Sequence, residues 1–525
     1  MEGARRLFLL QGARWSAALS AASLATPASS AGASYPFSLG VASGAPLPDS
    51  VILWTRILAN PLDASGTPPV ALAVRWEVAE DQAFRRIAAK GSATAVPELA
   101  HSVHVDVKGL LPARWYWYRF MLGGAVSPVG RTRTAPAPDA LPAMLKLAVA
   151  SCQHWEFGSY AAHRHIAASA PDLVAFLGDY IYEWGPYQLQ HPRRVTRDNE
   201  SFTLADYRRR YAQYKSDPDL QAAHRAAPWI VTWDDHEVAN DYANGRDELL
   251  REDFAARRAA AYQAFYEHMP LRLPQVRPGS FDRISLHQRY DWGRLARIHV
   301  LDDRQYRAVQ ACPRKGRGGS NAMFAHECAA LQDPRRSMLG QEQEAWLGSG
   351  LASSRAQWNI LAQQTLMAQS SSFPVIGART NRVWTDGWDG YPLARRRLLE
   401  SVLKSGAKNP VVLGGDVHTF YACELRPDFS RAVSKANPLA ATEFCGTSVT
   451  SSSRAQARTL AHVSNNPHMK YGRSDKRGYM LMEVTPKGMV THFMGLDNVF
   501  DARSEVGVLA SFRVADGRVG VESVG

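Results

Sequence analysis

The sequence lacks several features that mark special classes of protein. Beyond its N-terminal segment it has no apolar run of about eighteen residues, so we expect no membrane-spanning segment in the mature chain. It has no repeat of fixed period, and its composition is not that of a coiled coil, a collagen or a disordered chain. Hydrophobic residues make up 46% of the sequence, which predicts a folded protein with a sizeable core.

Acidic residues are fewer than basic ones, 49 against 61, and the formal net charge is +12. This balance favours anionic ligands without naming them. The densest arginine groups, at 208–210 and 395–397, fall in segments with helical character, so we interpret them as solvated helix faces. We therefore expect no stable association with nucleic acid, although nucleotides or DNA remain conceivable substrates.

Cysteine is scarce, and the count of five is odd. Cys312 and Cys328 bracket a loop rich in glycine and arginine, and Cys423 and Cys445 flank a loop between two expected strands. In an oxidising compartment either pair could form a disulfide, and the sequence leaves both pairings open. Cys152 remains without a partner and needs a separate explanation.

The first residues have the composition of an export signal. Arg5 and Arg6 precede Leu-Phe-Leu and a stretch rich in alanine, leucine and serine, which ends in small residues before position 34. The paired arginines resemble a twin-arginine signal. We expect residues 1–33 to be a signal peptide read by the twin-arginine export machinery, and the protein to be periplasmic or secreted.

Hydrophobic patterning divides the remaining chain. Residues 34–135 show short alternating runs separated by turns, which predicts a β-sandwich; "VDVKGLLPARWYWYRF" resembles a corner of fibronectin type III domains. Residues 136–143, rich in proline and alanine, read as a linker. From 144 to 525 apolar strands alternate with helical segments, which predicts an α/β domain with sheets covered by helices.

Four of the expected strands end in side chains that bind metals. Singly, each has an ordinary explanation: a buried cysteine, an Asx turn or a helix N-cap. Together they bring carboxylate, thiolate, phenol and imidazole groups to one sheet edge, because ligands bind beyond the carboxyl ends of such strands. A dinuclear or larger metal centre needs such a donor set. The four segments are Ser151–His154, Gly178–Glu183, Trp233–Glu237 and Gly414–His418.

The spellings "SCQ", "GDYIYE", "WDDHEVAN" and "GGDVH" resemble the PhoD-like alkaline phosphatases, within the calcineurin-like metallophosphoesterases. "LDDRQYR" and "WDGYPLARRR" add to the resemblance, although Asp303 stands where the family usually has threonine. The resemblance implies a four-layer α/β/β/α sandwich preceded by a small fibronectin type III-like β-sandwich domain.

The resemblance also implies roles for particular residues. Asp179 would bridge two metals, Fe(III) and Ca(II) in the family, and at least two ions are expected. His236 would lie near the leaving group and Arg304 would bind phosphate oxygens. The iron side would be completed by Cys152 and Tyr182, and the remaining ion or ions would be held by Asp235, Asp416, His418 and, as a further candidate, Asn240.

The expected function is hydrolysis of small phosphate monoesters by in-line attack of a metal-activated hydroxide. An alternative is a phosphodiesterase or phospholipase D-like activity at the same site, which the sequence does not separate from the first. A remote alternative is a non-catalytic envelope binding protein, for which we would expect Asp179 or His236 to be replaced.

Overall fold

A computed structural model describes residues 35–524, except 62–66, 188–193, 195, 197, 274–278 and 376–380. The predicted signal peptide at 1–33 therefore lies outside the described residues. Within the described part of the chain, no helix is both long and apolar enough to cross a bilayer.

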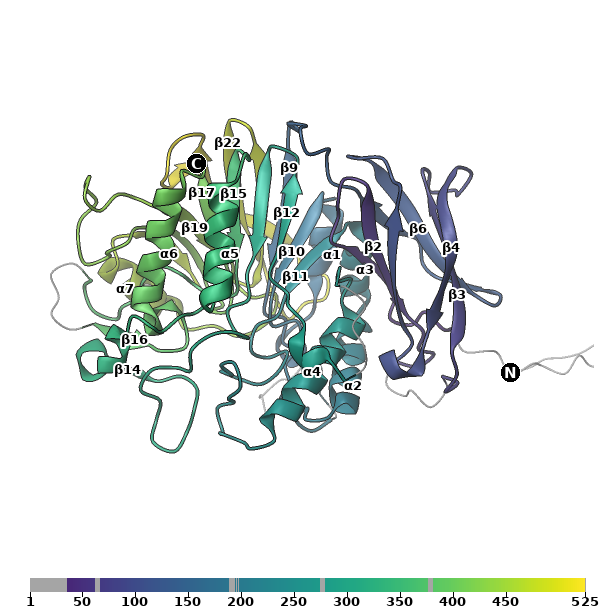
Figure 1. Cartoon of the computed structure of the whole chain (residues 1–525), viewed down its shortest axis with the longest axis horizontal. Helices are drawn as coiled ribbons and strands as arrows, with labels where there is room; N and C mark the ends of the chain where they lie inside the picture. Colours follow the sequence, from purple (N-terminus) through teal and green to yellow (C-terminus); the bar gives the residue numbers. More distant parts are fainter. Residues whose placement is uncertain are drawn as a thin grey trace, which may run out of the picture. The chain divides into compact units, whose positions relative to one another are not determined.

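A ten-stranded mixed sheet forms the first half of the scaffold (Figure 1). Its central strands β9, β10 and β11 run parallel, and all five residues of β10 are buried, as expected for a strand covered on both faces. In spatial order the strands are β24 (Glu522–Val524), β23 (Val506–Ala515), β22 (Gly488–Leu496), β21 (Gly478–Thr485), β9 (Leu145–Ala150), β10 (Leu173–Leu177), β11 (Trp229–Thr232), β1 (Val41–Gly44), β2 (Ser50–Arg56) and β5 (Ser102–Lys108).

A seven-stranded sheet forms the second half. Strands β13, β15, β17 and β19 are parallel neighbours, and antiparallel strands flank them on both sides. The order is β12 (Gln288–Trp292), β13 (Ala296–Val300), β15 (Trp358–Ala362), β17 (Pro410–Gly414), β19 (Ala441–Cys445), β18 (Phe420–Leu425) and β20 (Met469–Arg473).

Alternating side chains place the two sheets face to face. Leu177 of β10 and Leu413 of β17 belong to one buried cluster between the sheets. Phe176, one residue earlier in β10, points the other way into a cluster with the helices of the first sheet, and Val412 of β17 joins the helices of the second. This follows from the two-residue period of a strand.

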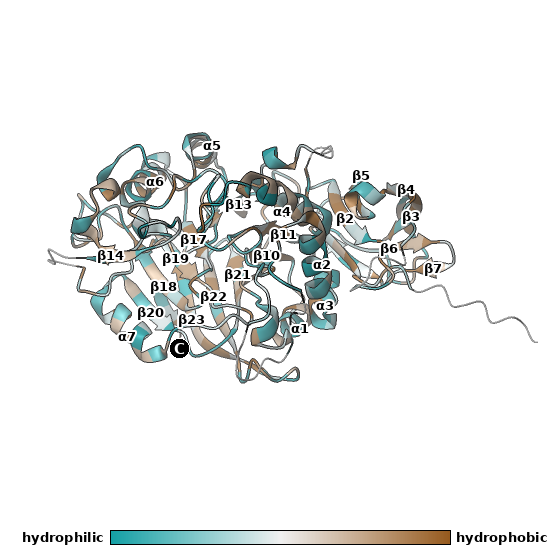
Figure 2. Cartoon of the chain, turned by 90° about the horizontal axis from the view of Figure 1, so that it is seen from below, coloured by the Kyte–Doolittle hydropathy of each residue, from teal (hydrophilic) through white to brown (hydrophobic). Residues whose placement is uncertain are grey.

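Helices cover the outward faces of both sheets (Figures 1 and 2). Apolar residues of four helices pack with the outer face of the first sheet: α1 (Ala161–Ala168), α2 (Leu204–Lys215), α3 (Pro218–Ala226) and α4 (Phe254–His268). The second sheet carries α5 (Gln341–Ala352) and α6 (Pro392–Ser405), and α7 (Gln456–Asn465) packs beside β20.

The N-terminal β region is built from two sheets. One is a five-stranded sheet of β3 (Leu72–Ala79), β4 (Ile87–Ala95), β6 (Trp115–Leu122), β7 (Ala125–Val126) and β8 (Gly130–Arg133). Val74 and Tyr118 of this sheet share a buried cluster with Val51 and Val105 of β2 and β5. Since β1, β2 and β5 also continue the ten-stranded sheet, these strands belong both to the N-terminal β region and to that sheet. Residues 35–525 form one compact unit.

The cysteines are only partly paired as the sequence suggested. Cys312 and Cys328 form a disulfide. Cys423 and Cys445, whose pairing the sequence left open, form no disulfide and are both buried free thiols. In the β18–β19 ladder Cys423 faces Glu443 and Cys445 faces Tyr421, so the two cysteines are diagonal neighbours. Diagonal side chains are about 7–8 Å apart, beyond the reach of a disulfide.

Candidate metal centre

The predicted ligands follow the carboxyl ends of four strands. Cys152 follows β9, Asp179 follows β10 and Asp235 follows β11, while Asp416 and His418 follow β17 of the other sheet. Cys152, Asp179, Asp416 and His418 all have positive φ, between 53° and 61°. Non-glycine residues pay for this backbone conformation, which clusters at functional sites. Strained turns in both sheets thus turn these side chains toward one edge.

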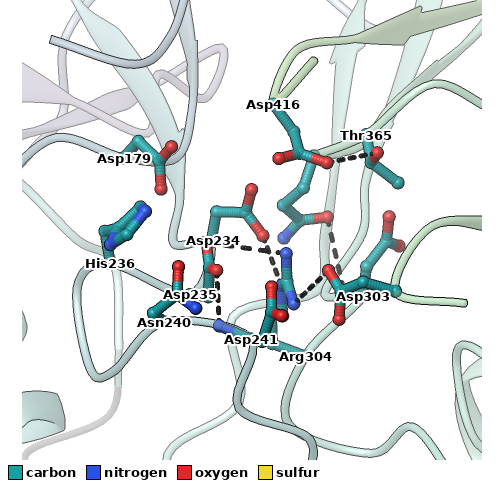
Figure 3. A network of polar contacts seen from close by, with 12 residues as sticks. Asp179, Asp234, Asp235, His236, Asn240, Asp241, Asp303, Arg304, Thr365 and Asp416 are labelled. Atoms are coloured by element: carbon teal, nitrogen blue, oxygen red, sulfur yellow. Dashed lines mark hydrogen bonds and ion pairs between the residues drawn. The ribbon is translucent and has the colours of Figure 1, made fainter. Parts of the chain in front are cut away.

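Two groups of donor atoms are close enough to hold a metal ion. Cys152, Asp179 and His418 form one group, and Asp179, Asp235 and His236 form the other; within each group the ligand atoms lie within 4.8 Å of one another. Asp179 belongs to both groups. The structure therefore brings together five of the predicted site residues around one shared carboxylate, and Figure 3 shows Asp179 beside His236.

Tyr182 joins the first of these groups. Its hydroxyl donates a hydrogen bond of 2.9 Å to Asp179 Oδ2 and lies 3.4 Å from His418 Nε2. Ser451 Oγ donates to the Tyr182 hydroxyl at 2.7 Å and also contacts the Cys152 carbonyl at 3.0 Å. The phenol oxygen thus lies among the donors that the sequence assigned to iron. His418 stands with Cys152 and Tyr182, whereas the family resemblance placed it with Asp235.

Asp416 and Asn240 lie at the border of the cluster. Asp416 Oδ2 accepts a hydrogen bond of 2.5 Å from Thr365 Oγ1, and burial raises the pKa of Asp416 to about 7. Asn240 Nδ2 donates to Glu248 Oε2 at 3.1 Å, so its amide is turned toward that carboxylate. In the described part of the chain Asp416 belongs to neither of the two tight donor groups.

The donor set fits cations. Asp179 Oδ1 is buried without a hydrogen-bond partner, and so is Asp234 Oδ2. Burial raises the pKa of Asp179 well above its ordinary value, and the neighbouring Asp235 and Asp234 carboxylates raise it further. Burial likewise raises the pKa of the Cys152 thiol, with Asp179 adding to the effect. Buried carboxylates gathered without compensating charge are costly, and bound cations would remove that cost.

Glu237 organises the strand ends, although the sequence did not single it out. It is fully buried, and its carboxylate accepts backbone N–H groups from Asp179 at 3.0 Å, Tyr180 at 2.5 Å and Asp234 at 2.8 Å. These contacts tie the turn after β10 to the turn after β11. The only signal in the sequence was a third acidic residue within Asp-Asp-His-Glu.

His236 is held by a partner that the sequence also left unassigned. Its Nδ1 lies 2.8 Å from Glu183 Oε2, and Glu183 Oε1 accepts the Asn240 backbone N–H at 2.7 Å. The imidazole ring stacks on Tyr182 with centroids 4.1 Å apart. Burial opposes the charged imidazolium, but Asp235, Glu183 and Asp179 outweigh it and raise the pKa of His236 well above its ordinary value. The geometry leaves Nε2 as the nitrogen free to serve the site.

Arg304 lies inside a ring of carboxylates (Figure 3). Its Nε donates to Asp234 Oδ1 at 2.5 Å, one terminal nitrogen donates to Asp386 Oδ2 at 2.8 Å, and the other is 3.5 Å from Asp235 Oδ1. The side chain is only 2% exposed. Arg304 therefore lies next to the candidate metal ligands, with its guanidinium engaged by aspartates, and its contact with phosphate oxygens stays a prediction. The sequence pattern did not single out Asp386.

Asp303, the departure from the family pattern, is buried behind this ring. Neither of its carboxylate oxygens has a hydrogen-bond partner, and burial raises its pKa to about 8. A protonated Asp303 avoids adding a further negative charge to the site near neutral pH. The preceding residue, Asp302, shapes the turn, because its carboxylate accepts the backbone N–H groups of Arg304 and Gln305, at 3.0 and 2.9 Å.

Comparison with known proteins agrees with this geometry. Residues 147–493 match the family model of the PhoD-like phosphatases, and residues 21–136 match the N-terminal domain of PhoD-like phosphatases. The chain is 44% identical over 500 residues to alkaline phosphatase D of Bacillus subtilis, covering 94% of this chain and 83% of that protein.

A solved structure of PhoD, with 44% sequence identity, superposes with a TM-score of 0.87 and covers 94% of this chain and 92% of that one. It shares the mixed α/β sheets and the N-terminal domain. With the family model spanning most of the chain and these relatives matching nearly its whole length, the chain belongs to the PhoD-like phosphatase family.

Proposed function

We propose that the protein is a phosphoric ester hydrolase that cleaves phosphate monoesters, as an alkaline phosphatase does. The observation that carries this proposal is the pair of donor groups that share Asp179 at the carboxyl ends of β9, β10, β11 and β17. Family membership supports it, and so does the similarity to the Bacillus subtilis protein, which is named an alkaline phosphatase. Asp179 and His236, which a purely binding protein would not need, are both present.

The first donor group suits a trivalent ion. A thiol and a phenol beside a carboxylate favour a Lewis-acidic cation, and we assign Cys152, Asp179, Tyr182 and His418 to Fe(III). Asp235 with Asp179 supplies the oxygen ligands that suit Ca(II), and Asp416 and Asn240 are the remaining candidates. When bound, the ions supply an activated water and positive charge toward the phosphoryl oxygens.

The chain's own residues complete the reaction. His236, oriented through Nδ1 by Glu183, offers its Nε2 proton to the departing alkoxide. This step requires the imidazole to be protonated on both nitrogens, which the hydrogen bond from Nδ1 to the Glu183 carboxylate favours. Arg304 keeps Asp234 and Asp386 in position and adds fixed positive charge beside the site. A direct clamp on phosphate by Arg304 requires that one of these aspartates release it.

His236→Gln tests the proposed proton donor. We expect kcat to fall by about 10²–10⁴-fold for alkyl phosphates, the usual contribution of general acid catalysis. The fall should be much smaller for p-nitrophenyl phosphate, whose leaving group needs little protonation. Steady-state kinetics on both substrates check this, and an equal loss on both would place His236 in metal binding instead.

The function itself is tested with p-nitrophenyl phosphate and bis(p-nitrophenyl) phosphate, at alkaline pH, on protein of measured metal content. We expect monoester cleavage that is lost on chelation and returns with added Fe(III) and Ca(II). Faster cleavage of the diester would move the protein to the phosphodiesterase or phospholipase D-like alternative. No cleavage of either ester by the metal-loaded protein would favour a binding role.

We further infer that the protein is exported through the twin-arginine machinery to the periplasm or beyond, with residues 1–33 as its signal. The paired arginines of the sequence support this. We expect that changing Arg5 and Arg6 to lysine abolishes export, and cell fractionation would show whether the protein stays in the cytoplasm.

We also interpret the fold as the family's four-layer sandwich with a fibronectin type III-like N-terminal domain. The two facing sheets with helices on their outer faces support the four-layer interpretation.

A further inference from the structure

We propose that a cationic pocket beside the candidate metal centre binds a second phosphate, carried by the leaving group of the substrate. This inference rests on the proposed phosphoesterase function and specifies its substrate class. The preferred substrates are phosphate esters whose leaving group is itself phosphorylated, rather than small esters with a neutral leaving group.

The pocket opens directly next to the predicted metal ligands. It has a volume of about 390 Å³, and Thr365 and Val417 form part of its wall. Thr365 donates a hydrogen bond of 2.5 Å to Asp416, and Val417 lies between Asp416 and His418 in the chain. A phosphoryl group held at the metal site would therefore direct one of its ester substituents toward the pocket.

Three arginines give the pocket its charge: Arg382 of strand β16 (Arg382–Trp384), Arg454 just before α7, and Arg458 in the first turns of α7. In the part of the chain that the structure describes, none of the three guanidinium groups has an ion pair or a hydrogen bond. This differs from Arg304 and Arg395, which are both neutralised by aspartates.

No free acidic side chain offsets these charges. Asp389 is the one acidic residue in the pocket wall, and it accepts a hydrogen bond of 2.6 Å from Arg395 and another from the Ser370 backbone. His462 lies one turn beyond Arg458 and also lines the pocket. Burial, Arg454 and Arg458 lower the pKa of His462 to about 4, so it is neutral near neutral pH.

Such a pocket fits a phosphate. The guanidinium group presents a fork of donors that matches phosphate oxygens, and a phosphate monoester carries nearly two negative charges at neutral pH. Trp384 and Trp388 add flat apolar surface to the wall, against which a carbon linker can lie. A small monoester would leave the three arginines unused, so the pocket selects for a second anion.

The test uses α,ω-alkanediol monophosphates and the matching bisphosphates of increasing chain length. The two phosphates of each bisphosphate are equivalent, so either cleavage releases the same phosphorylated alcohol. We expect kcat/KM per phosphate to be at least about 10-fold higher for the best bisphosphate than for its monophosphate, which corresponds to one charge-assisted contact. Arg454→Gln with Arg458→Gln should bring this ratio close to one.

The matched control is Arg355→Gln, an exposed arginine that precedes β15 at the end opposite the site. It removes one exposed positive charge away from the pocket and should leave the cleavage of both substrates, and their ratio, unchanged. A ratio near one in the native protein, or a ratio that the pocket substitutions do not change, overturns the proposal. If the native metal-loaded protein cleaves neither the bisphosphates nor the monophosphates, the result counts against the proposed function instead.

Binding gives a readout that does not depend on turnover. In the metal-loaded His236→Gln protein, which should turn over alkyl phosphates only slowly, calorimetry with the best bisphosphate should show affinity that falls at least about 10-fold when Arg454 and Arg458 are also changed to glutamine. An unchanged affinity would overturn the pocket assignment even if the protein hydrolyses no ester. A ω-carboxyalkyl phosphate of equal length should bind less tightly, since its second group carries a single charge.

Discussion

Asp179→Asn should abolish turnover and remove bound metal. Asp179 is the carboxylate common to both donor groups, and it is buried with one oxygen lacking any hydrogen-bond partner. Asparagine keeps the shape but removes the charge and directs an NH₂ group toward one of the cation positions. Because metal ions contribute several kcal/mol of transition-state stabilisation, we expect kcat/KM to fall by roughly 1000-fold or more.

The measurement pairs phosphatase kinetics with elemental analysis of the purified protein. The matched control is Asp49→Asn, the same change at an exposed position in the turn between β1 and β2, which should leave activity and metal content unchanged. Circular dichroism would confirm that both variants fold. An Asp179→Asn protein with full activity would remove Asp179 from the bridging position and with it the basis of the two-metal assignment.

Arg304→Met should have the second large effect, on stability as well as activity. Arg304 is nearly inaccessible, and the two aspartates that accept its hydrogen bonds, Asp234 and Asp386, are each about 1% exposed. Removing one partner of a buried ion pair leaves uncompensated charge and costs about 3–5 kcal/mol. We expect the free energy of unfolding to fall by this amount. The stability of Arg304→Lys should lie between those of the native protein and Arg304→Met, because lysine keeps the charge but not the forked guanidinium.

Chemical denaturation of the metal-loaded proteins checks the change in unfolding free energy. Arg335→Met is the matched control, because Arg335 forms an exposed ion pair with Asp333 and its loss should have little effect on stability. An Arg304→Met protein of normal stability with a strongly raised KM would show that the arginine acts mainly on the substrate phosphate. Normal stability with normal kinetics would contradict both roles.

The candidate metal ligands could be selected from the sequence because the residues that follow parallel strands lie at a common edge of the sheet. Cys152, Asp179 and Asp235 each come directly after a buried apolar run, and that local pattern survives in the structure. The grouping of His418 with Cys152 could not be predicted, since it depends on how the second sheet faces the first.

The residues that position the candidate ligands could not be predicted from sequence patterns. Glu183 and Glu237 look like ordinary acidic residues of a turn, and only the fold reveals that they hold His236 and three backbone N–H groups. Asp386 follows the short strand β16, which belongs to neither of the two large sheets, and its pairing with Arg304 arises from long-range packing. The absence of a Cys423–Cys445 disulfide could not be predicted either, because the strand register decides which side chains face each other.

Strands β1, β2 and β5 belong both to the N-terminal β region and to the ten-stranded sheet, and this limits how such chains can be recombined. The two family models meet near the linker at 136–143, which suggests a natural point of exchange. A chain that begins at the predicted linker would lose β1, the strand whose Gly44 pairs with Trp229 of β11. It would expose a sheet edge beside the strand that delivers Asp235. We therefore expect the N-terminal region to be inherited together with the catalytic region, as a matched pair and not as an interchangeable module.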